Sequence, residues 1–303
     1  MNRGRYYIDV ARQSDRLFYA LLGASLIPVG ALVYALARAA HDIRAALADA
    51  PGPLTGFCRQ AVIYTVDPFA HVAYVAFGAA AVVALALGTT AGVATHLRTR
   101  RVLREHRADA AVPERLLRLA GAASIRRIRL IASPQPLAFT FGYLAPRVAV
   151  SDSLLRSLDD SELEAVLLHE AEHVRTRDPL RVLVVAAISR AFLFAPLLRT
   201  LAESFRVAKE IDADQAVIQA MGNRHALVSA LLTAGTYDSE GATAGFADAL
   251  SARIASLEGE EPVSAGAGWR AIIATWLALV VIAAGLFVIG TGAVDAHALH
   301  ICA

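Results

Sequence analysis

Residues 161–173, with the sequence SELEAVLLHEAEH, decide how the rest of the chain is interpreted. Ser161 is followed three residues later by Glu164, which is the capping-box pattern of a helix start. Leu163 and Leu167 then recur at helical spacing. The segment is therefore predicted to form one helix that includes its last five residues, HEAEH.

The HEAEH pentapeptide places two histidines on the same face of that helix. His169 and His173 are four residues apart, so their side chains lie within about 6 Å of each other and can bind one zinc ion. Glu170 follows the first histidine and is the candidate general base that activates water. The alternative, an amphipathic helix that carries two histidines by chance, remains open at this point.

A catalytic zinc site needs a third protein ligand and leaves one position for water. We predict Glu210 as that ligand, and Asp214, one helical turn later, as the carboxylate that accepts the outer N–H of a ligating histidine. The alternative is a solvated acidic turn. Asp212 lies on another face of the same helix, and Asp178 before Pro179 fits a structural helix start as well as a functional role.

Composition separates this chain from ordinary soluble proteins. Of its 303 residues, 56% are hydrophobic and only 18% are charged, against about 25% charged residues in a typical soluble domain. The mean hydropathy is +0.50. These values exclude a disordered chain, a collagen and a disulfide-dense scaffold, and the net charge of +2 gives no indication of direct nucleic-acid binding. The lipid bilayer is the expected partner.

Three apolar stretches, 17–40, 69–97 and 269–289, are long enough to cross a bilayer as helices. A signal peptide is the alternative for the first, because Ala35-Leu36-Ala37 resembles a cleavage site, but its apolar run is longer than that of a typical signal peptide.

Arginine distribution orients the spans, because the arginine-rich flanks of a membrane helix stay in the cytoplasm. The predicted topology has cytoplasmic segments at 1–16 and 98–268, transmembrane helices at 17–40, 69–97 and 269–289, and external segments at 41–68 and 290–303. We therefore expect a multi-pass protein of the inner (plasma) membrane. Cys58 and Cys302 both fall on the external side, where they either form a disulfide or remain unrelated thiols.

The region 98–268 is the part large enough to fold as a domain with its own core. It is predicted to contain a helix at 114–120 and short strands at 129–132, 138–141 and 147–150. The apolar segment 182–198 is predicted to be a helical hairpin that does not cross the membrane, because two crossings need about 40 residues and fewer separate His173 from Glu210. The expected fold is a mostly α integral membrane protein with a cytoplasmic α+β protease domain and a small sheet.

These motifs together resemble the membrane-integrated gluzincins, which are zinc metallopeptidases. The resemblance rests on residues 138–150, on HEAEH with Arg175, Arg177, Asp178 and Pro179 after it, and on residues 210–214. Two relatives compete, the BlaR/MecR antirepressors and the HtpX and CAAX-prenyl-protease family. A short apolar stretch interrupted by Pro196 is what the BlaR/MecR type implies, whereas HtpX would have transmembrane helices there. The segment after 289 is too short for a penicillin-binding sensor, so we expect no β-lactam sensing.

Three further features are candidates for the same site. Arg253 resembles an arginine near the end of such domains and is predicted to stabilise charge on the carbonyl oxygen; His225 is a second candidate. Both also fit ordinary surface or helix positions. The strand at 138–141 is a candidate edge for an extended substrate peptide, or else a plain core hairpin.

The function predicted from these residues is that of a membrane-anchored zinc endopeptidase in which Glu170 acts as the base. Its expected substrates are a cytoplasmic regulator of repressor type, in signal transduction, or a segment of a membrane protein. The alternatives are an HtpX-like quality-control protease and a non-catalytic signalling or scaffold protein that retains the metal fold. Glu170 argues against the scaffold, because a binding module needs no base.

Overall fold

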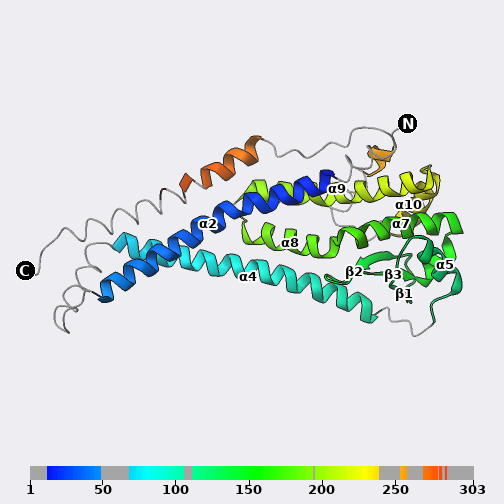
Figure 1. Cartoon of the computed structure of the whole chain (residues 1–303), viewed down its shortest axis with the longest axis horizontal. Coiled ribbons are helices and arrows are strands. Elements are labelled where there is room, and N and C mark those ends of the chain that lie inside the picture. The colour runs from blue at the N-terminus through cyan, green and yellow to red at the C-terminus, as the bar shows by residue number, and fades with distance from the viewer. Residues whose placement is uncertain are drawn as a thin grey trace, which may run out of the picture. The chain divides into compact units, whose positions relative to one another are not determined.

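The computed structural model describes residues 12–48, 68–105, 111–193, 195–238, 253–257, 269–278, 280–281 and 284. These residues form helices and one small three-stranded sheet, as predicted (Figure 1). The expected disulfide between Cys58 and Cys302 lies outside the described residues.

The helices and strands follow one another along the chain in a simple order. The helices are α2 (Arg12–Ala48), α4 (Pro68–Glu105), α5 (Glu114–Ala122), α6 (Asp152–Ser157), α7 (Asp160–Thr176), α8 (Asp178–Ala191), α9 (Pro196–Met221) and α10 (His225–Asp238). The strands are β1 (Ile128–Ile131), β2 (Ala138–Phe141) and β3 (Arg147–Ser151), within one residue of the predicted positions.

The chain divides into two compact units. The first comprises Met1–Ala20, Thr90–Ala187 and Thr200–Gly266, and it contains HEAEH, the sheet and Glu210. The second comprises Leu21–Thr89, Ile188–Arg199 and Ala267–Ala303. Within the second unit, the backbone N–H of Leu197 donates to Oγ1 of Thr275 at 3.0 Å. The end of α8 and the start of α9, inside the predicted hairpin 182–198, thus belong to the same unit as most of each predicted membrane span.

Among the helices that the structure describes, none has both the length and the apolar character needed to cross a membrane.

The sheet has the strand order β1-β3-β2, with β1 parallel and β2 antiparallel to β3. In this register Ile128 lies opposite Val148, and Ala138 lies opposite Val150. Gly142 makes the turn after β2 with φ +91°, and a Cβ at this position would lie 2.9 Å from the carbonyl oxygen of Ala145. The tight turn therefore requires glycine. Among the described strands, the order places β2 at one edge of the sheet.

Helix α7 packs against the sheet through its apolar face. Leu163 and Leu167 are fully buried, as the helical spacing predicted, and share a core with Leu116 of α5 and with Val148 and Val150 of β3. Burying side chains of this size contributes about 1.5–3 kcal/mol each. Because this face is locked into the core, the HEAEH end of the helix has a fixed orientation.

Helix α7 begins two residues earlier than predicted, so the assignment of Ser161 and Glu164 as the capping box is wrong. The box is formed by Asp159, whose Oδ1 accepts the N–H of Glu162 at 2.8 Å, while Oε2 of Glu162 accepts the N–H of Asp159 at 3.0 Å. Both residue pairs satisfy the pattern. The earlier start prevails because it adds backbone hydrogen bonds, such as that from Leu163 N–H to the Asp159 carbonyl.

The first turn of α2 is attached to α8 and α9 within the first unit. The N–H of Ser14 donates to Oδ2 of Asp212 at 3.3 Å, and Arg181 pairs with Asp15 at 2.5 Å. The rings of Phe18 and Phe205 lie 5.7 Å apart. Asp212 thus caps another helix, consistent with its expected place on a different face from Glu210.

Asp212→Asn is expected to raise the free energy of unfolding by about 1–3 kcal/mol above pH 6. Burial, reinforced by the carboxylates of Glu172 and Asp15, raises the pKa of Asp212 to about 6. The folded protein therefore binds more protons than the unfolded chain between about pH 4 and pH 6, and it loses stability as the pH rises through that range. Asparagine avoids this loss and keeps an oxygen for Ser14. Thermal unfolding of both metal-free proteins from pH 4 to pH 8 measures the difference, and a gain of equal size at every pH would contradict the explanation.

Candidate metal centre

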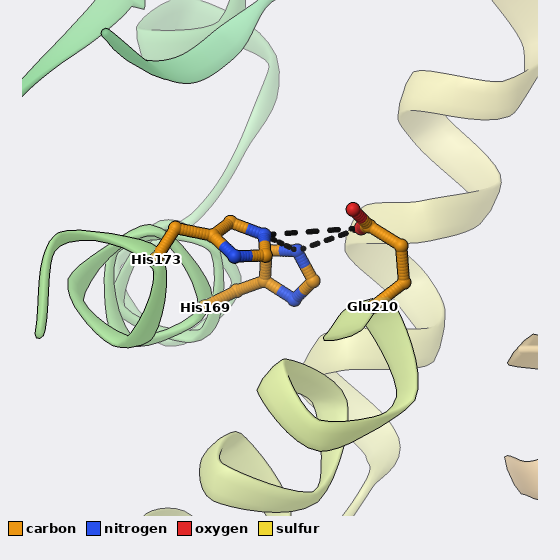
Figure 2. Close-up of side chains that lie close together, drawn as sticks. All are labelled: His169, His173 and Glu210. Atoms are coloured by element: carbon orange, nitrogen blue, oxygen red, sulfur yellow. Dashed lines mark hydrogen bonds and ion pairs between the residues drawn. The ribbon is translucent and has the colours of Figure 1, made fainter. Parts of the chain in front are cut away.

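Three side chains from α7 and α9 point toward one another in the first unit (Figure 2). Nε2 of His169 and Nε2 of His173 lie 3.1 Å apart. Oε2 of Glu210 lies 3.4 Å from Nε2 of His169 and 3.8 Å from Nε2 of His173. The structure thus brings the predicted ligand of α9 to the histidine pair of α7.

The distances between these atoms fit a zinc ion. Nitrogen and oxygen ligands bind zinc at about 2.0–2.2 Å, so ligand atoms at two corners of a tetrahedron are about 3.3–3.6 Å apart. The observed separations of 3.1, 3.4 and 3.8 Å bracket that value. Three ligand atoms in this arrangement leave one corner of the tetrahedron for water or substrate.

Each histidine has its own carboxylate on the far side of the ring. Nδ1 of His173 lies 2.6 Å from Oδ2 of Asp178, and Nδ1 of His169 lies 3.0 Å from Oδ1 of Asp214. The second contact is an ion pair whose N–H direction does not reach hydrogen-bond geometry. Carboxylates in these positions keep the proton on Nδ1 and turn Nε2 toward a metal.

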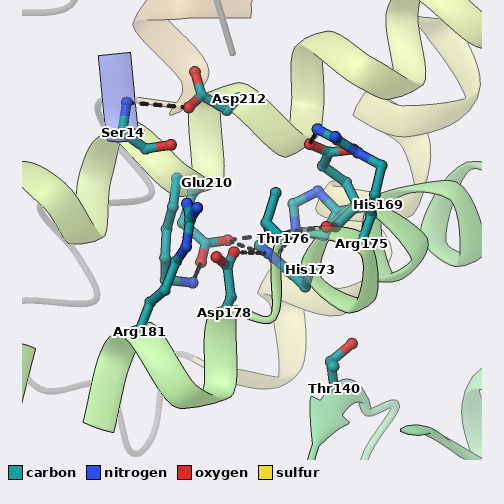
Figure 3. Close-up of polar contacts among 12 residues, drawn as sticks. Ser14, Thr140, His169, His173, Arg175, Thr176, Asp178, Arg181, Glu210 and Asp212 are labelled. Atoms are coloured by element: carbon teal, nitrogen blue, oxygen red, sulfur yellow. Dashed lines mark hydrogen bonds and ion pairs between the residues drawn. The ribbon is translucent and has the colours of Figure 1, made fainter. Parts of the chain in front are cut away.

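Asp178 is the carboxylate whose role the sequence left open (Figure 3). Arg177 has left-handed backbone angles, with φ 55°, and this turns the chain so that Asp178 begins α8 directly beside α7. Burial raises the pKa of Asp178, but the contact with His173 and the charge of Lys209 outweigh it and hold that pKa below its ordinary value. Asp178 therefore both begins α8 and contacts His173 in the site.

Arg253 lies in the site, but most of its guanidinium contacts Asp214. Its Nε and Nη2 donate to the two carboxylate oxygens of Asp214 at 2.7 Å each, and Nη1 lies 3.8 Å from Oε2 of Glu210. Burial raises the pKa of Asp214, yet His169 and Arg253 together lower it below its ordinary value. Arg253 thus fixes the carboxylate behind His169, and its contact with a carbonyl oxygen stays a prediction. His225 is exposed and lies outside the lining of the cavity at this site.

Glu170 is 6% exposed and contacts the sheet. Oγ1 of Thr140, on β2, lies 2.7 Å from Oε2 of Glu170 and donates to it. In the sequence, the signal for Thr140 is limited to its place in the predicted strand 138–141. This contact ties the candidate base to the edge strand.

Lys209 is a second residue of the site that the sequence motifs do not predict. It is the only lysine in the chain, its side chain is 15% exposed, and Nζ lies 2.5 Å from Oε1 of Glu210. Burial lowers the pKa of Lys209, but Glu210, Asp178 and Glu170 raise it above its ordinary value. The pKa of Glu210 is in turn held well below its ordinary range, since Lys209 and the histidines outweigh the effect of burial.

Acidic side chains outnumber basic ones by two around the three converging residues. The acidic ones are Glu170, Asp178, Glu210 and Asp214, and the basic ones are Lys209 and Arg253. Burial lowers the pKa of His169, but Asp214 and Glu210 raise it to about 9. In the metal-free protein His169 therefore carries a second ring proton. A divalent cation that displaces this proton would also neutralise the acidic excess.

A cavity of about 660 Å³ opens onto these residues. Its polar end contains His169, Glu170, His173 and Glu210. Asp178, Lys209 and Arg253 also line the cavity. Largely apolar walls come from residues 136–143 around β2 and from α10 (Leu227, Ala230 and Leu231), whereas α4 contributes mainly polar side chains (Thr95, His96, Thr99 and Arg100, with Leu103). The cavity can hold several residues of a peptide beside the edge strand.

Several curated relatives of this chain are named as proteases. It is 39% identical over 92 residues to "Protease HtpX homolog" of Methanopyrus kandleri, which covers 28% of this chain and 29% of that protein. It is 43% identical over 82 residues to the homolog of Pelotomaculum thermopropionicum, with 26% and 29% covered, and 29% identical over 141 residues to that of Pyrococcus furiosus, with 35% and 49% covered. The chain thus spans less than a third of the length of the first two relatives.

Family comparison covers much more of the sequence than these pairwise matches. No solved structure matches the chain. The family model described as BlaR1 peptidase M56 matches residues 58–257, a range that includes the sheet, HEAEH, Glu210 and Arg253. Because this range is well over half of the sequence, the chain belongs to the BlaR1 peptidase M56 family.

Proposed function

We propose that this protein is a membrane-anchored, zinc-dependent endopeptidase whose metal is held by His169, His173 and Glu210. The observation that carries the proposal is the convergence of three ligand atoms, spaced as zinc requires, beside the buried Glu170 at one end of a cavity. Membership in a peptidase family supports it.

The reaction needs a base, an attacking water and a polarised peptide carbonyl. Zinc in such a site supplies Lewis-acid polarisation and makes water more acidic. Glu170 takes the proton of the attacking water and passes it to the leaving amine, while Thr140 holds its carboxylate in place. Arg253 keeps Asp214 behind His169. We propose Nη1 of Arg253 as the nitrogen that would meet a carbonyl oxygen.

The substrate is proposed to lie in extended form along β2. Among the described strands, β2 pairs with β3 only, and its residues line the same cavity as Glu170. Addition of a strand at a sheet edge satisfies the backbone of a peptide irrespective of its sequence, and the apolar walls then select side chains. A cytoplasmic regulator of repressor type or an unfolded membrane-protein segment would fit this mode.

The membrane topology in this proposal comes from the sequence. Spans at 17–40, 69–97 and 269–289 are supported by apolar length, and arginine distribution supports a cytoplasmic location for 1–16 and for the protease region 98–268. The segments 41–68 and 290–303 would then be external, in an inner-membrane protein.

A second candidate function is an HtpX-like protease for membrane-protein quality control. The names of the matched relatives favour it. Comparing protein fragments in cells that carry the native chain or Glu170→Gln separates the candidates. Loss of fragments from one regulator indicates a signalling protease, and loss of fragments from many membrane proteins indicates quality control. Identical fragment patterns would leave the non-catalytic scaffold as the better account.

Removal of the metal is expected to abolish peptidase activity reversibly. The purified protein in detergent should cleave an unfolded protein such as fluorescently labelled casein, lose this activity with 1,10-phenanthroline, and regain it with stoichiometric zinc, because the ligand atoms converge on one metal position. The non-chelating 1,7-phenanthroline is the control. Full activity of the protein stripped of metal would contradict the proposal.

A further inference from the structure

Lys209 occupies a position that the proposed reaction leaves unexplained. The chain has 29 basic residues other than histidine, and Lys209 is its only lysine. It directly precedes Glu210 on α9, is largely buried, and lines the cavity together with the converging side chains. Burying an ammonium group is costly unless it is paired, so its partner is informative.

The two carboxylate oxygens of Glu210 have different partners. Oε2 faces the histidines, at 3.4 Å from Nε2 of His169 and 3.8 Å from Nε2 of His173, and in Figure 2 a dashed line runs from each histidine to this oxygen. Oε1 lies 2.5 Å from Nζ of Lys209. One oxygen is therefore directed at the metal position and the other is held by a cation.

We propose that Lys209 is a positioning residue that restricts Glu210 to binding the metal through one oxygen. A carboxylate can bind zinc with one oxygen or with both. If both oxygens of Glu210 bound, the metal would become five-coordinate, and the second oxygen would crowd the position that a catalytic zinc leaves to water. The inference rests on the proposed metal site and specifies how its open position is maintained.

The chemistry of the side chain explains why lysine suits this task. Its ammonium is a compact charge on a flexible stem and can contact one oxygen of the neighbouring residue on the same helix. An arginine presents a planar fork that pairs with both oxygens of a carboxylate, as Arg253 does with Asp214. At position 209 such a fork would compete with the metal for Oε2.

Cobalt-substituted protein provides a test that does not depend on activity, because the visible absorption of Co²⁺ is intense in four-coordinate sites and weaker in five-coordinate ones. The native protein is expected to give the four-coordinate spectrum. Lys209→Met should give the five-coordinate spectrum and bind zinc at least as tightly as the native protein, because the repulsion between ammonium and dication is removed. Its kcat should fall about 10- to 100-fold. Lys209→Gln, whose amide can still donate to Oε1, should keep the native spectrum.

Two outcomes would overturn the proposal: a four-coordinate spectrum in Lys209→Met, or loss of metal from that variant. Lys209→Arg provides an independent test if the methionine variant does not fold. The arginine variant should bind zinc about tenfold or more weakly than the native protein, since the guanidinium fork engages both oxygens of Glu210. Native affinity in Lys209→Arg would also refute the role. If the native protein binds no metal, the proposed function fails; if it binds metal and the variants behave as the native protein does, only the role of Lys209 fails.

Discussion

Glu170→Gln is expected to retain its zinc and to lose peptidase activity by about 100- to 10,000-fold, the usual contribution of a general base. The amide preserves the size of the side chain and can still contact Oγ1 of Thr140, which lies 2.7 Å from the native carboxylate. It cannot accept a proton from water. Initial rates on labelled casein, together with elemental analysis of the same samples, measure both quantities.

Glu172→Gln is the matched control for this substitution. Glu172 lies on the same helix and is similarly buried, but its carboxylate pairs with Arg175 and its side chain does not line the cavity. Activity within about twofold of the native value is expected, with a modest loss of stability from the broken ion pair. Cleavage at the native rate by Glu170→Gln would remove the enzyme hypothesis for this site, and loss of zinc would mean that this residue holds the metal.

Glu210→Ala is expected to lower zinc affinity by more than about a hundredfold. Changes to the outer partners of metal ligands alone cost about 10- to 100-fold, and here a ligand itself is removed. The purified native protein should contain about one zinc per chain, and the variant, like the double variant His169→Ala with His173→Ala, should contain almost none. Elemental analysis after dialysis against a weak chelator measures the occupancy.

Asp212→Asn serves as the control on the same helix. Its side chain contacts Ser14 at the start of α2 and not the converging ligands, so full zinc occupancy is expected. If the double histidine variant kept its zinc, the metal site would have to lie elsewhere in the chain. If Glu210→Ala alone kept it, a different third ligand would be required.

Local patterns in the sequence predicted most of the fold of the first unit. The strands around 129–132, 138–141 and 147–150 could be predicted because turn-forming residues bound short β-forming runs. The burial of Leu163 and Leu167 followed from helical spacing. The start of α7 could not be placed as well, because Asp159 with Glu162 and Ser161 with Glu164 satisfy the same capping pattern. Only the number of backbone hydrogen bonds made by the folded helix separates them.

The candidate site likewise has some features that the sequence predicts and others that only the folded structure reveals. The sequence by itself determined which segments carry ligand-type side chains and that His169 and His173 share a helix face, since helical periodicity is a local property. Only the tertiary structure decided that Asp178 stands behind His173 and that Thr140 contacts Glu170. These contacts depend on how a turn directs one helix and how a helix packs on a strand.

The roles of the cations were likewise decided by the fold. Arg253 resembled a catalytic residue in sequence, but in the structure its guanidinium pairs with Asp214 on α9. Lys209 stood out in the sequence only by being the single lysine, and its significance depends on a buried contact with one oxygen of Glu210. Spacing along a helix predicts which residues share a face, whereas the partner of a buried charge is set by the segments that pack around it and exclude water.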